Sequence, residues 1–210
     1  MNISSRLFGP LLLLVSAAWL VTGCFNLKPV EEAPRYFVLS PVPGEAKVSS
    51  QTGPETTQAV VIGSVKLPGY LAKKSLAIRK SANEIEYLQT AQWAENLEQG
   101  FGRVFAADLA ARFPDRQVRR FGRSGEASVE IHVSVNRFDV DVAGKGELTA
   151  NYRILASGKN QTTKTGQFRA TRTGARPESD PKEATATLSA LVDDLSAELA
   201  KAVQAMGDQK

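Results

Sequence analysis

The sequence is poor in the side chains that carry covalent or metal chemistry. Among its 210 residues there is one cysteine, Cys24, and one histidine, His132. A single cysteine cannot form a disulfide within the chain or supply the thiolates of a structural zinc site. A single histidine could bind zinc only together with carboxylates, and no carboxylates have the spacing of such a site. We therefore expect no metal and no cofactor, and a fold that is stabilised by packing.

The sequence also lacks the motifs of common hydrolases and nucleotide-binding proteins. It has no Gly-x-Ser-x-Gly elbow, and Gly100-Phe101-Gly102 is not continued as a phosphate-binding loop. His132 falls on the polar face of an expected strand, where a solvated side chain is favoured over a catalytic one. Ser64 has no visible base, and pairs such as Asp139 and Asp141 arise routinely on solvated strand faces. The sequence predicts that the protein is not an enzyme.

Only one long apolar run occurs, at residues 11–21, and it is shorter than the roughly 20 residues that cross a membrane. Its length is typical of the core of an export signal, and Arg6 is the only charged residue before it. The run leads into Val21-Thr22-Gly23-Cys24, which resembles the lipobox of a bacterial lipoprotein. The alternatives are an ordinary secretory signal with a chance cysteine nearby, and a buried free thiol.

The lipobox predicts cleavage between Gly23 and Cys24, which removes residues 1–23 as a signal peptide. The Cys24 thiol would receive a diacylglyceryl group, and the new amino terminus an acyl chain such as palmitate. One chain anchors a protein only weakly, with ~0.8 kcal/mol for each buried CH₂, so a stable anchor takes two or more chains. Residues 24–34 contain two prolines and little to bury, which predicts a lipidated flexible tether.

The formal net charge is +4, a mild positive excess. A basic protein can bind nucleic acid, but an exported lipoprotein seldom meets any. Anionic lipid head groups or an acidic partner are the counterparts that we expect. We predict a membrane association through the lipid anchor and no nucleic-acid binding.

Residues 35–210 predict a single domain in which turn signals separate short strands. The clearest strand pattern is at residues 127–142, where every second residue from Val129 to Val135 is apolar. The apolar phase then shifts by one residue, which predicts a β-bulge near Asn136-Arg137. Further strands are expected at residues 35–40, 59–67, 75–80, 84–89, 118–121, 147–155 and 162–173.

Two helices are expected from apolar residues that recur at spacings of three and four. The first starts near Ala94 and carries its stripe from Leu97 to Leu109; its two glycines, Gly100 and Gly102, suggest the close approach of another element. The second starts at residues 180–183, where an aspartate cap is followed by proline and, three residues later, glutamate. Its apolar stripe comprises Ala184, Leu188, Leu191, Val192, Leu195, Leu199, Ala202 and Val203. Together the elements predict an α+β fold: an antiparallel or mixed β-sheet with two amphipathic helices packed on one face.

One turn is rich in large side chains. Pro68-Gly69 ends an expected strand and displays Tyr70 and Leu71, and Trp93 stands just before the first helix. These residues either close the end of the core or form an apolar and aromatic docking patch.

Taken in order, these segments are similar to the PqiC-type auxiliary lipoproteins of ABC-type and MCE-domain lipid transport systems. The similarity starts at Cys24 and the aromatic strand Arg35-Tyr36-Phe37-Val38-Leu39. It continues through residues 62–71 and 93–109, the long strand to Phe138 and the leucine-rich last helix. Gly69 departs from the family pattern, which usually has an acidic residue before the tyrosine.

The resemblance implies a non-catalytic lipoprotein of the outer membrane of a Gram-negative bacterium, facing the periplasm. It would be an auxiliary docking subunit of an MCE/ABC-type intermembrane lipid transport system that supports membrane integrity. Its expected partners are an MCE-domain protein and, in a ring, further copies of itself. Phe25 fits this sorting, because an aspartate after Cys24 would favour retention in the inner membrane.

The expected partner-binding residues are Pro68, Tyr70, Leu71 and Trp93. The alternative function is that of a lipid-binding carrier or an envelope assembly chaperone. A protein of that class would hold an acyl chain in an apolar cavity.

Overall fold

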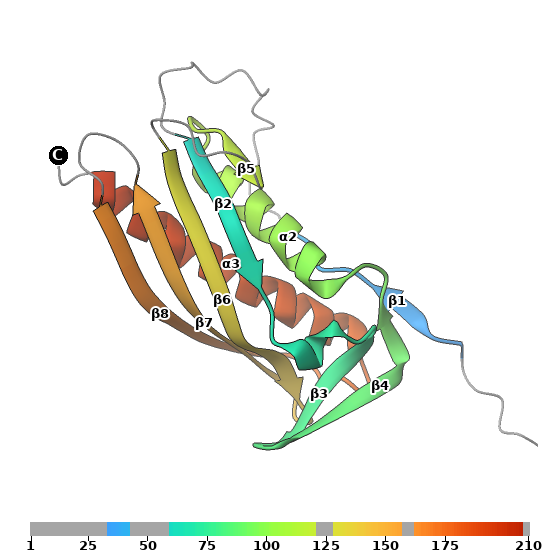
Figure 1. Cartoon of the computed structure of the whole chain (residues 1–210). Helices are drawn as coiled ribbons and strands as arrows, with labels where there is room; N and C mark the ends of the chain where they lie inside the picture. The colour runs from blue at the N-terminus through green and yellow to red at the C-terminus, as the bar shows by residue number, and fades with distance from the viewer. Residues whose placement is uncertain (1–32, 43–58, 121–127, 157–161, 208–210) are drawn as a thin grey trace, which may run out of the picture. The chain divides into compact units, whose positions relative to one another are not determined.

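A mixed β-sheet carries two long helices on one of its faces (Figure 1). The computed structural model describes residues 33–42, 59–120, 128–156 and 162–207, and Pro34–Lys210 forms one compact unit. The described elements are β1 (Arg35–Phe37), β2 (Ala59–Lys66), the 3₁₀ helix η1 (Gly69–Ala72), β3 (Ser75–Ser81), β4 (Glu84–Trp93), α2 (Leu97–Arg112), β5 (Val118–Arg120), β6 (Ser128–Asp141), β7 (Lys145–Ala156), β8 (Thr162–Thr173) and α3 (Pro181–Gly207).

Strand β6 is the centre of the sheet. On one side it pairs with β7, and β7 pairs with β8, in an antiparallel meander. On its other side β6 pairs with β2 near its start and with β3 near its end, both in parallel. Strand β5 extends the sheet beyond β2, while β4 and then β1 extend it beyond β3. The predicted fold class, an α+β fold on a mixed sheet, is confirmed.

The predicted bulge lies in β6. The register with β7 shifts between Val135 and Arg137, so that Asn136 is the extra residue. Apolar residues on both sides of this shift, such as Val133 and Phe138, are buried against the helices. Because the bulge corrects the phase, one strand keeps a continuous apolar face over 14 residues.

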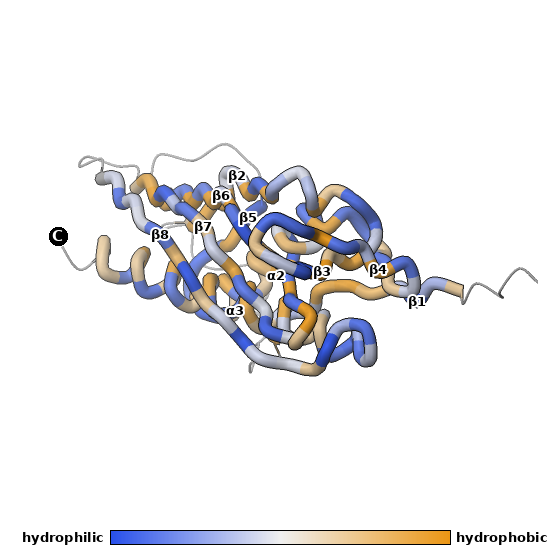
Figure 2. Tube along the Cα trace, turned by 90° about the horizontal axis from the view of Figure 1, so that it is seen from below, coloured by the Kyte–Doolittle hydropathy of each residue, from blue (hydrophilic) through white to orange (hydrophobic). Residues whose placement is uncertain are grey.

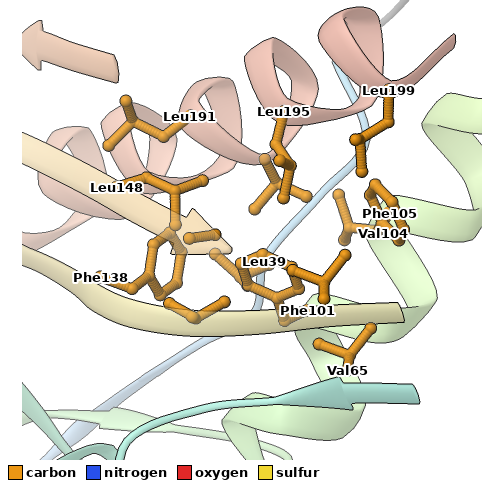
Figure 3. Close-up of a cluster of buried hydrophobic side chains, with 14 of the residues drawn as sticks. Leu39, Val65, Phe101, Val104, Phe105, Phe138, Leu148, Leu191, Leu195 and Leu199 are labelled. Atoms are coloured by element: carbon orange, nitrogen blue, oxygen red, sulfur yellow. The ribbon is translucent and has the colours of Figure 1, made fainter. Parts of the chain in front are cut away.

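The core lies between the sheet and the two helices. Phe101 of α2 meets Phe138 of β6 edge to face, with ring centroids 5.2 Å apart, and both side chains are buried. Figure 3 shows that leucines of α3 point from the helix towards these rings and towards Leu148 of β7. All residues of the two predicted helical stripes are buried. Burial of each large side chain contributes about 1.5–3 kcal/mol, so this layer is the main source of stability.

Polar caps fix where the helices begin. The carboxylate of Asp180 accepts the Glu183 N–H at 3.1 Å, so the predicted cap of α3 is confirmed. Helix α2 starts at Leu97, later than predicted, because the Asn96 side chain accepts the N–H groups of Glu98 and Gln99.

The expectation for the two glycines of α2 is wrong. A Cβ at Gly102 would meet nothing within 4 Å, and one at Gly100 would meet the side chain of Glu95 rather than another strand.

The two faces of the sheet differ in polarity. Residues of β7 that face the helices, such as Leu148 and Ile154, are buried, whereas Asn151 and Arg153 on the other face are exposed. Figure 2 shows that β8 is hydrophilic along most of its length. The polar face therefore contains the side chains that could make specific contacts.

Candidate functional site

Tyr70 ties the turn after β2 to the middle of the sheet. Its hydroxyl donates to Asp139 Oδ2 at 2.7 Å and accepts the Phe138 N–H at 3.3 Å. Its backbone carbonyl accepts the hydroxyl of Tyr87 at 2.9 Å. Burial, and next the hydrogen bond to Asp139, raise the pKa of Tyr70 to about 12. The tyrosine is therefore a neutral hydrogen-bond donor at any physiological pH.

Asp139 is buried, which corrects the expectation that it is a solvated strand residue. Its side chain is 0% exposed, and its carboxylate accepts Arg79 Nη2 at 2.7 Å and Arg137 Nε at 2.9 Å. The hydrogen bond to Asp139 raises the pKa of Arg79. Asp141, its supposed partner, instead accepts the N–H groups of Ala143 and Lys145 in the turn after β6. The two aspartates therefore do not act as a carboxylate pair.

The charges continue across the sheet. Glu147 of β7 accepts Arg137 Nη1 at 2.7 Å and Arg169 Nη2 of β8 at 2.9 Å. The alternating series Arg79, Asp139, Arg137, Glu147 and Arg169 is called here the charge ladder. It connects β3, β6, β7 and β8 on the polar face. Because each of its carboxylates already has two guanidinium partners, the ladder is suited to holding strands together rather than to moving protons.

The structure divides the four predicted partner-binding residues. Leu71 and Trp93 are each 5% exposed and belong to the core, so they offer almost no surface to a partner. Trp93 points inward because it follows the same alternation in β4 as buried Ala91. Pro68 and Tyr70 are half-buried. Partner binding by the four residues stays a prediction, and of the four only Pro68 and Tyr70 are appreciably accessible in the isolated domain.

His132 has partners that the sequence did not reveal. In the parallel register of β2 and β6 it lies opposite Ser64, whose Oγ is 2.9 Å from His132 Nδ1. Glu130 Oε1 is 3.1 Å from Nε2. A Cβ at Gly63 would lie 2.6 Å from the histidine ring, so the absence of a side chain at that position makes room for it. The expectation that Ser64 has no nearby base is wrong.

Serine, histidine and glutamate form a nucleophilic triad only in a suitable setting. Catalysis also requires donors aimed at a developing oxyanion and a cleft that positions a substrate. The three side chains lie on the outer face of two adjacent strands, where those of His132 and Glu130 are 25% and 27% exposed. We assign this cluster a role in joining β2 to β6.

The segment of residues 35–42, called here the N-terminal strap, runs from β1 across the helices. Leu39 is 1% exposed and enters the core between α2 and α3 (Figure 3). Its carbonyl accepts Arg103 Nη2 at 2.9 Å, and the next N–H, of Ser40, donates to Ser189 Oγ at 3.2 Å. The N–H of Val42 donates to the carboxylate of Asp108. Beyond the pairing of β1 with β4, the strap is therefore held by the buried side chain of Leu39 and by these polar contacts with the helices.

Asp108 lies beneath the end of the strap with an incomplete set of partners. The residue is 2% exposed, and its Oδ2 is the only buried side-chain oxygen or nitrogen of the described residues that has no hydrogen-bond partner. Burial, and next the charge of Asp193, raise its pKa from 3.8 to about 6. Arg112 donates to the backbone carbonyl of Asp108 at 2.9 Å and binds the carboxylate of Asp193 at 2.6 Å.

The fold is an α+β domain of one mixed sheet and two helices, and the polar clusters described above join its neighbouring strands. No described helix is long and apolar enough to cross a membrane, and no group of three or more metal-ligating side chains occurs in the part of the chain that the structure describes. Residues 37–200 match the family model of the ABC-type transport auxiliary lipoprotein component, and the chain belongs to this family.

Two solved structures share the fold. One, of an uncharacterized protein, has a TM-score of 0.67 at 17% identity and covers 82% of this chain and 99% of that chain. The other, of a protein from Xanthomonas campestris, has a TM-score of 0.59 at 18% identity and covers 85% of this chain and 96% of that chain. Among curated proteins none matches significantly. Gly23 and Cys24 lie outside the described residues, so cleavage and acylation there stay predictions.

Proposed function

We propose that the protein is a lipid-anchored, non-catalytic docking subunit of an MCE/ABC-type lipid transport system, attached to the outer membrane and facing the periplasm. The observation that carries this proposal is the family match over residues 37–200, in a chain whose Val21-Thr22-Gly23-Cys24 resembles a lipobox. Acyl groups on Cys24 hold the domain at one bilayer. The domain then acts at high local concentration, so a modest interface is enough to bind a partner.

The interior of the domain supports docking over the alternative function of a carrier. A carrier must keep an apolar space open for an acyl chain. Here the space between sheet and helices is occupied by buried side chains of β6, β7, α2, α3 and the strap (Figure 3). The polar face, by contrast, carries the ion pairs of the charge ladder and exposed polar side chains, which are available for contact with an MCE-domain protein or with a second copy.

The lipid anchor is tested by mass spectrometry of the protein purified from membranes. We expect a first residue of Cys24 carrying three acyl chains, and loss of this mass in Cys24→Ser. A first residue without lipid, or residues 1–23 still attached, would overturn the proposal. Phe25→Asp tests the destination: it should move the protein to the inner-membrane fraction of a density gradient, while the matched control Phe25→Ser stays in the outer-membrane fraction.

The partner is tested by affinity purification from detergent-solubilised membranes. We expect an MCE-domain protein to copurify with the wild-type chain. Tyr70→Phe keeps the ring in place and should keep the partner, whereas exposed changes on the polar face, such as Asn151→Arg, should reduce its recovery. Recovery of bound phospholipid with the unacylated domain, and of no MCE-domain protein, would favour the carrier instead.

A further inference from the structure

The large apolar side chains that the domain exposes are concentrated at one place. Of the four found in the described ranges, three belong to the N-terminal strap: Tyr36 is 64% exposed, Val38 45% and Val42 42%. Single exposed apolar residues are ordinary on a protein surface. Three within seven residues of one segment form a local cluster, which points to a contact outside the domain.

These side chains point away from the domain because the strap is extended. Phe37 and Leu39 alternate with them and face inward, Phe37 half-buried and Leu39 buried in the core. The contacts of Leu39, Ser40 and Val42 with the helices fix the segment in place. At about 3.3 Å per residue the outward row from Tyr36 to Val42 is about 20 Å long. The segment thus holds three exposed apolar side chains along one edge, with the exposed Ser40 and Pro41 between the second and the third.

The short length of chain between Cys24 and the strap limits how far this edge can lie from the lipid anchor. Cys24 precedes Tyr36 by 12 residues. A fully extended chain spans at most about 3.3–3.6 Å per residue, so the edge cannot lie more than about 43 Å from an anchored Cys24. Of all the described elements, β1 and the rest of the strap come first after Cys24 in the sequence, so the shortest length of chain joins them to the anchor.

The composition of the strap fits the head-group region of a bilayer. Tyrosine is enriched there because its ring is apolar and its hydroxyl is hydrated. Arg35 precedes it, exposed, with its guanidinium 5.3 Å from the ring centroid of Phe37. A guanidinium is a preferred partner of phosphate groups. A basic chain, with a formal net charge of +4, is further attracted to anionic lipid.

We propose that the outward side chains of the strap, Tyr36, Val38 and Val42, lie in the head-group region of the membrane that holds Cys24, with Arg35 flanking them at the start of the strap. This contact rests on the proposed lipid anchor and adds an orientation to it. An anchor alone would let the domain rotate on its tether. A second contact along a 20 Å edge fixes which sides of the sheet face the periplasm. Four residues bind a bilayer weakly, but the anchor makes their binding effectively intramolecular.

The test replaces the acyl groups by a defined attachment. The mature chain from residue 24, carrying Cys24→Ser and an amino-terminal hexahistidine, is bound to vesicles of phosphatidylethanolamine, phosphatidylglycerol and a nickel-chelating lipid. Because Cys24 is the only natural cysteine, single labels can be placed with Val38→Cys or Val42→Cys. Gln167→Cys, at an exposed position of β8, is the matched control. Each variant carries an environment-sensitive nitrobenzoxadiazole group.

We expect a blue shift and at least twofold quenching by lipid-attached nitroxides for labels at positions 38 and 42, and neither for a label at 167. Tyr36→Asp should reduce the quenching at position 42 at least threefold with the protein still attached. Equal responses at the three positions, or none, would overturn the proposal. So would a blue shift at position 38 that grows with protein concentration without vesicles, because a second copy would then cover the strap.

The result does not depend on acylation, since hexahistidine supplies the attachment. A failure of the strap to insert is therefore distinguishable from a failure of Cys24 to carry lipid, which only the mass spectrum reports.

Discussion

Two aspartates are buried to the same degree in this domain, and their surroundings differ completely. Asp139, on the polar face of the sheet, is 1% exposed and has two guanidinium groups and a phenol on its carboxylate. Asp108, between the helices, is 2% exposed; its nearest arginine binds Asp193 instead. Burial alone therefore does not set the behaviour of a carboxylate. Its donors decide whether the charge is stabilised or becomes sensitive to pH.

The largest effect is expected at Asp139. Asp139→Ala leaves Arg79 and Arg137 without their shared counter-charge, at side-chain exposures of 16% and 28%. Breaking a buried ion pair in this way costs about 3 kcal/mol of unfolding free energy. Urea denaturation at pH 7 measures this loss. Glu198→Ala, an exposed change on α3, is the control and should cost less than about 0.5 kcal/mol. A loss at Asp139 no larger than the control would show that the ladder is not a stabilising network.

At Asp108 we expect the opposite effect: removal of the charge should increase the free energy of unfolding. Its pKa is about 6 in the folded protein against an ordinary value of 3.8, so folding favours the protonated form. The stability that this proton confers is fully present below about pH 3.8 and is lost as the pH rises through about 6. Asp108→Asn should therefore stabilise the protein by about 2 kcal/mol at pH 7.5 and by much less at pH 4. Urea denaturation across this range measures the difference. An unchanged pH slope in the variant would mean that another group is responsible.

A substitution at Tyr70 can separate the contribution of its hydroxyl to stability from the contribution of its ring. Tyr70→Phe removes the donor to Asp139 and the acceptor for the Phe138 N–H while keeping the packing. A hydrogen bond to a charged group is worth about 1.5 kcal/mol, which sets the expected loss. Tyr36→Phe removes an exposed hydroxyl and serves as the control, with no change expected. Equal midpoints for the two variants in thermal unfolding would contradict the role given to Tyr70.

The smallest effect is expected at the half-exposed cluster of His132. Ser64→Ala removes one partner of the ring, and Glu130 keeps the other. The expected loss is about 0.5 kcal/mol, because water can replace the hydroxyl. The wild-type protein should also resist a fluorophosphonate probe. Covalent labelling of Ser64, seen by peptide mass spectrometry and absent in Ser64→Ala, would show a nucleophile that we do not assign.

Local patterns predicted the parts of the fold that depend on neighbouring residues. The phase shift after Val135 located the bulge, and the residues from Asp180 to Glu183 located the start of α3. Both signals are written within a few residues of the feature they specify. The parallel pairing of β2 with β6 is different, because it joins residues about 70 positions apart and leaves no local trace.

The clusters on the polar face were missed for the same reason. Ser64 and His132 are 68 positions apart, as are Tyr70 and Phe138. Only the sheet brings them together. A polar residue at an alternate strand position reads the same in sequence whether it is solvated or, like Asp139, enclosed by arginines from another strand. Leu71 and Trp93 are buried although they lie next to turns. A position beside a turn therefore does not by itself expose a large side chain.

The hydrogen bond from Ser40 to Ser189 spans 149 positions and joins the first described segment to the last helix. A chain made from its amino terminus can place its strap against β4 and α2 first, but this contact has to wait until α3 is complete. Contacts of such long range form late in folding and leave apolar surface open meanwhile. A chain that stopped before α3 would lack the helix that covers one side of the Leu39 side chain. The last helix of the domain thus completes the docking of its first described segment.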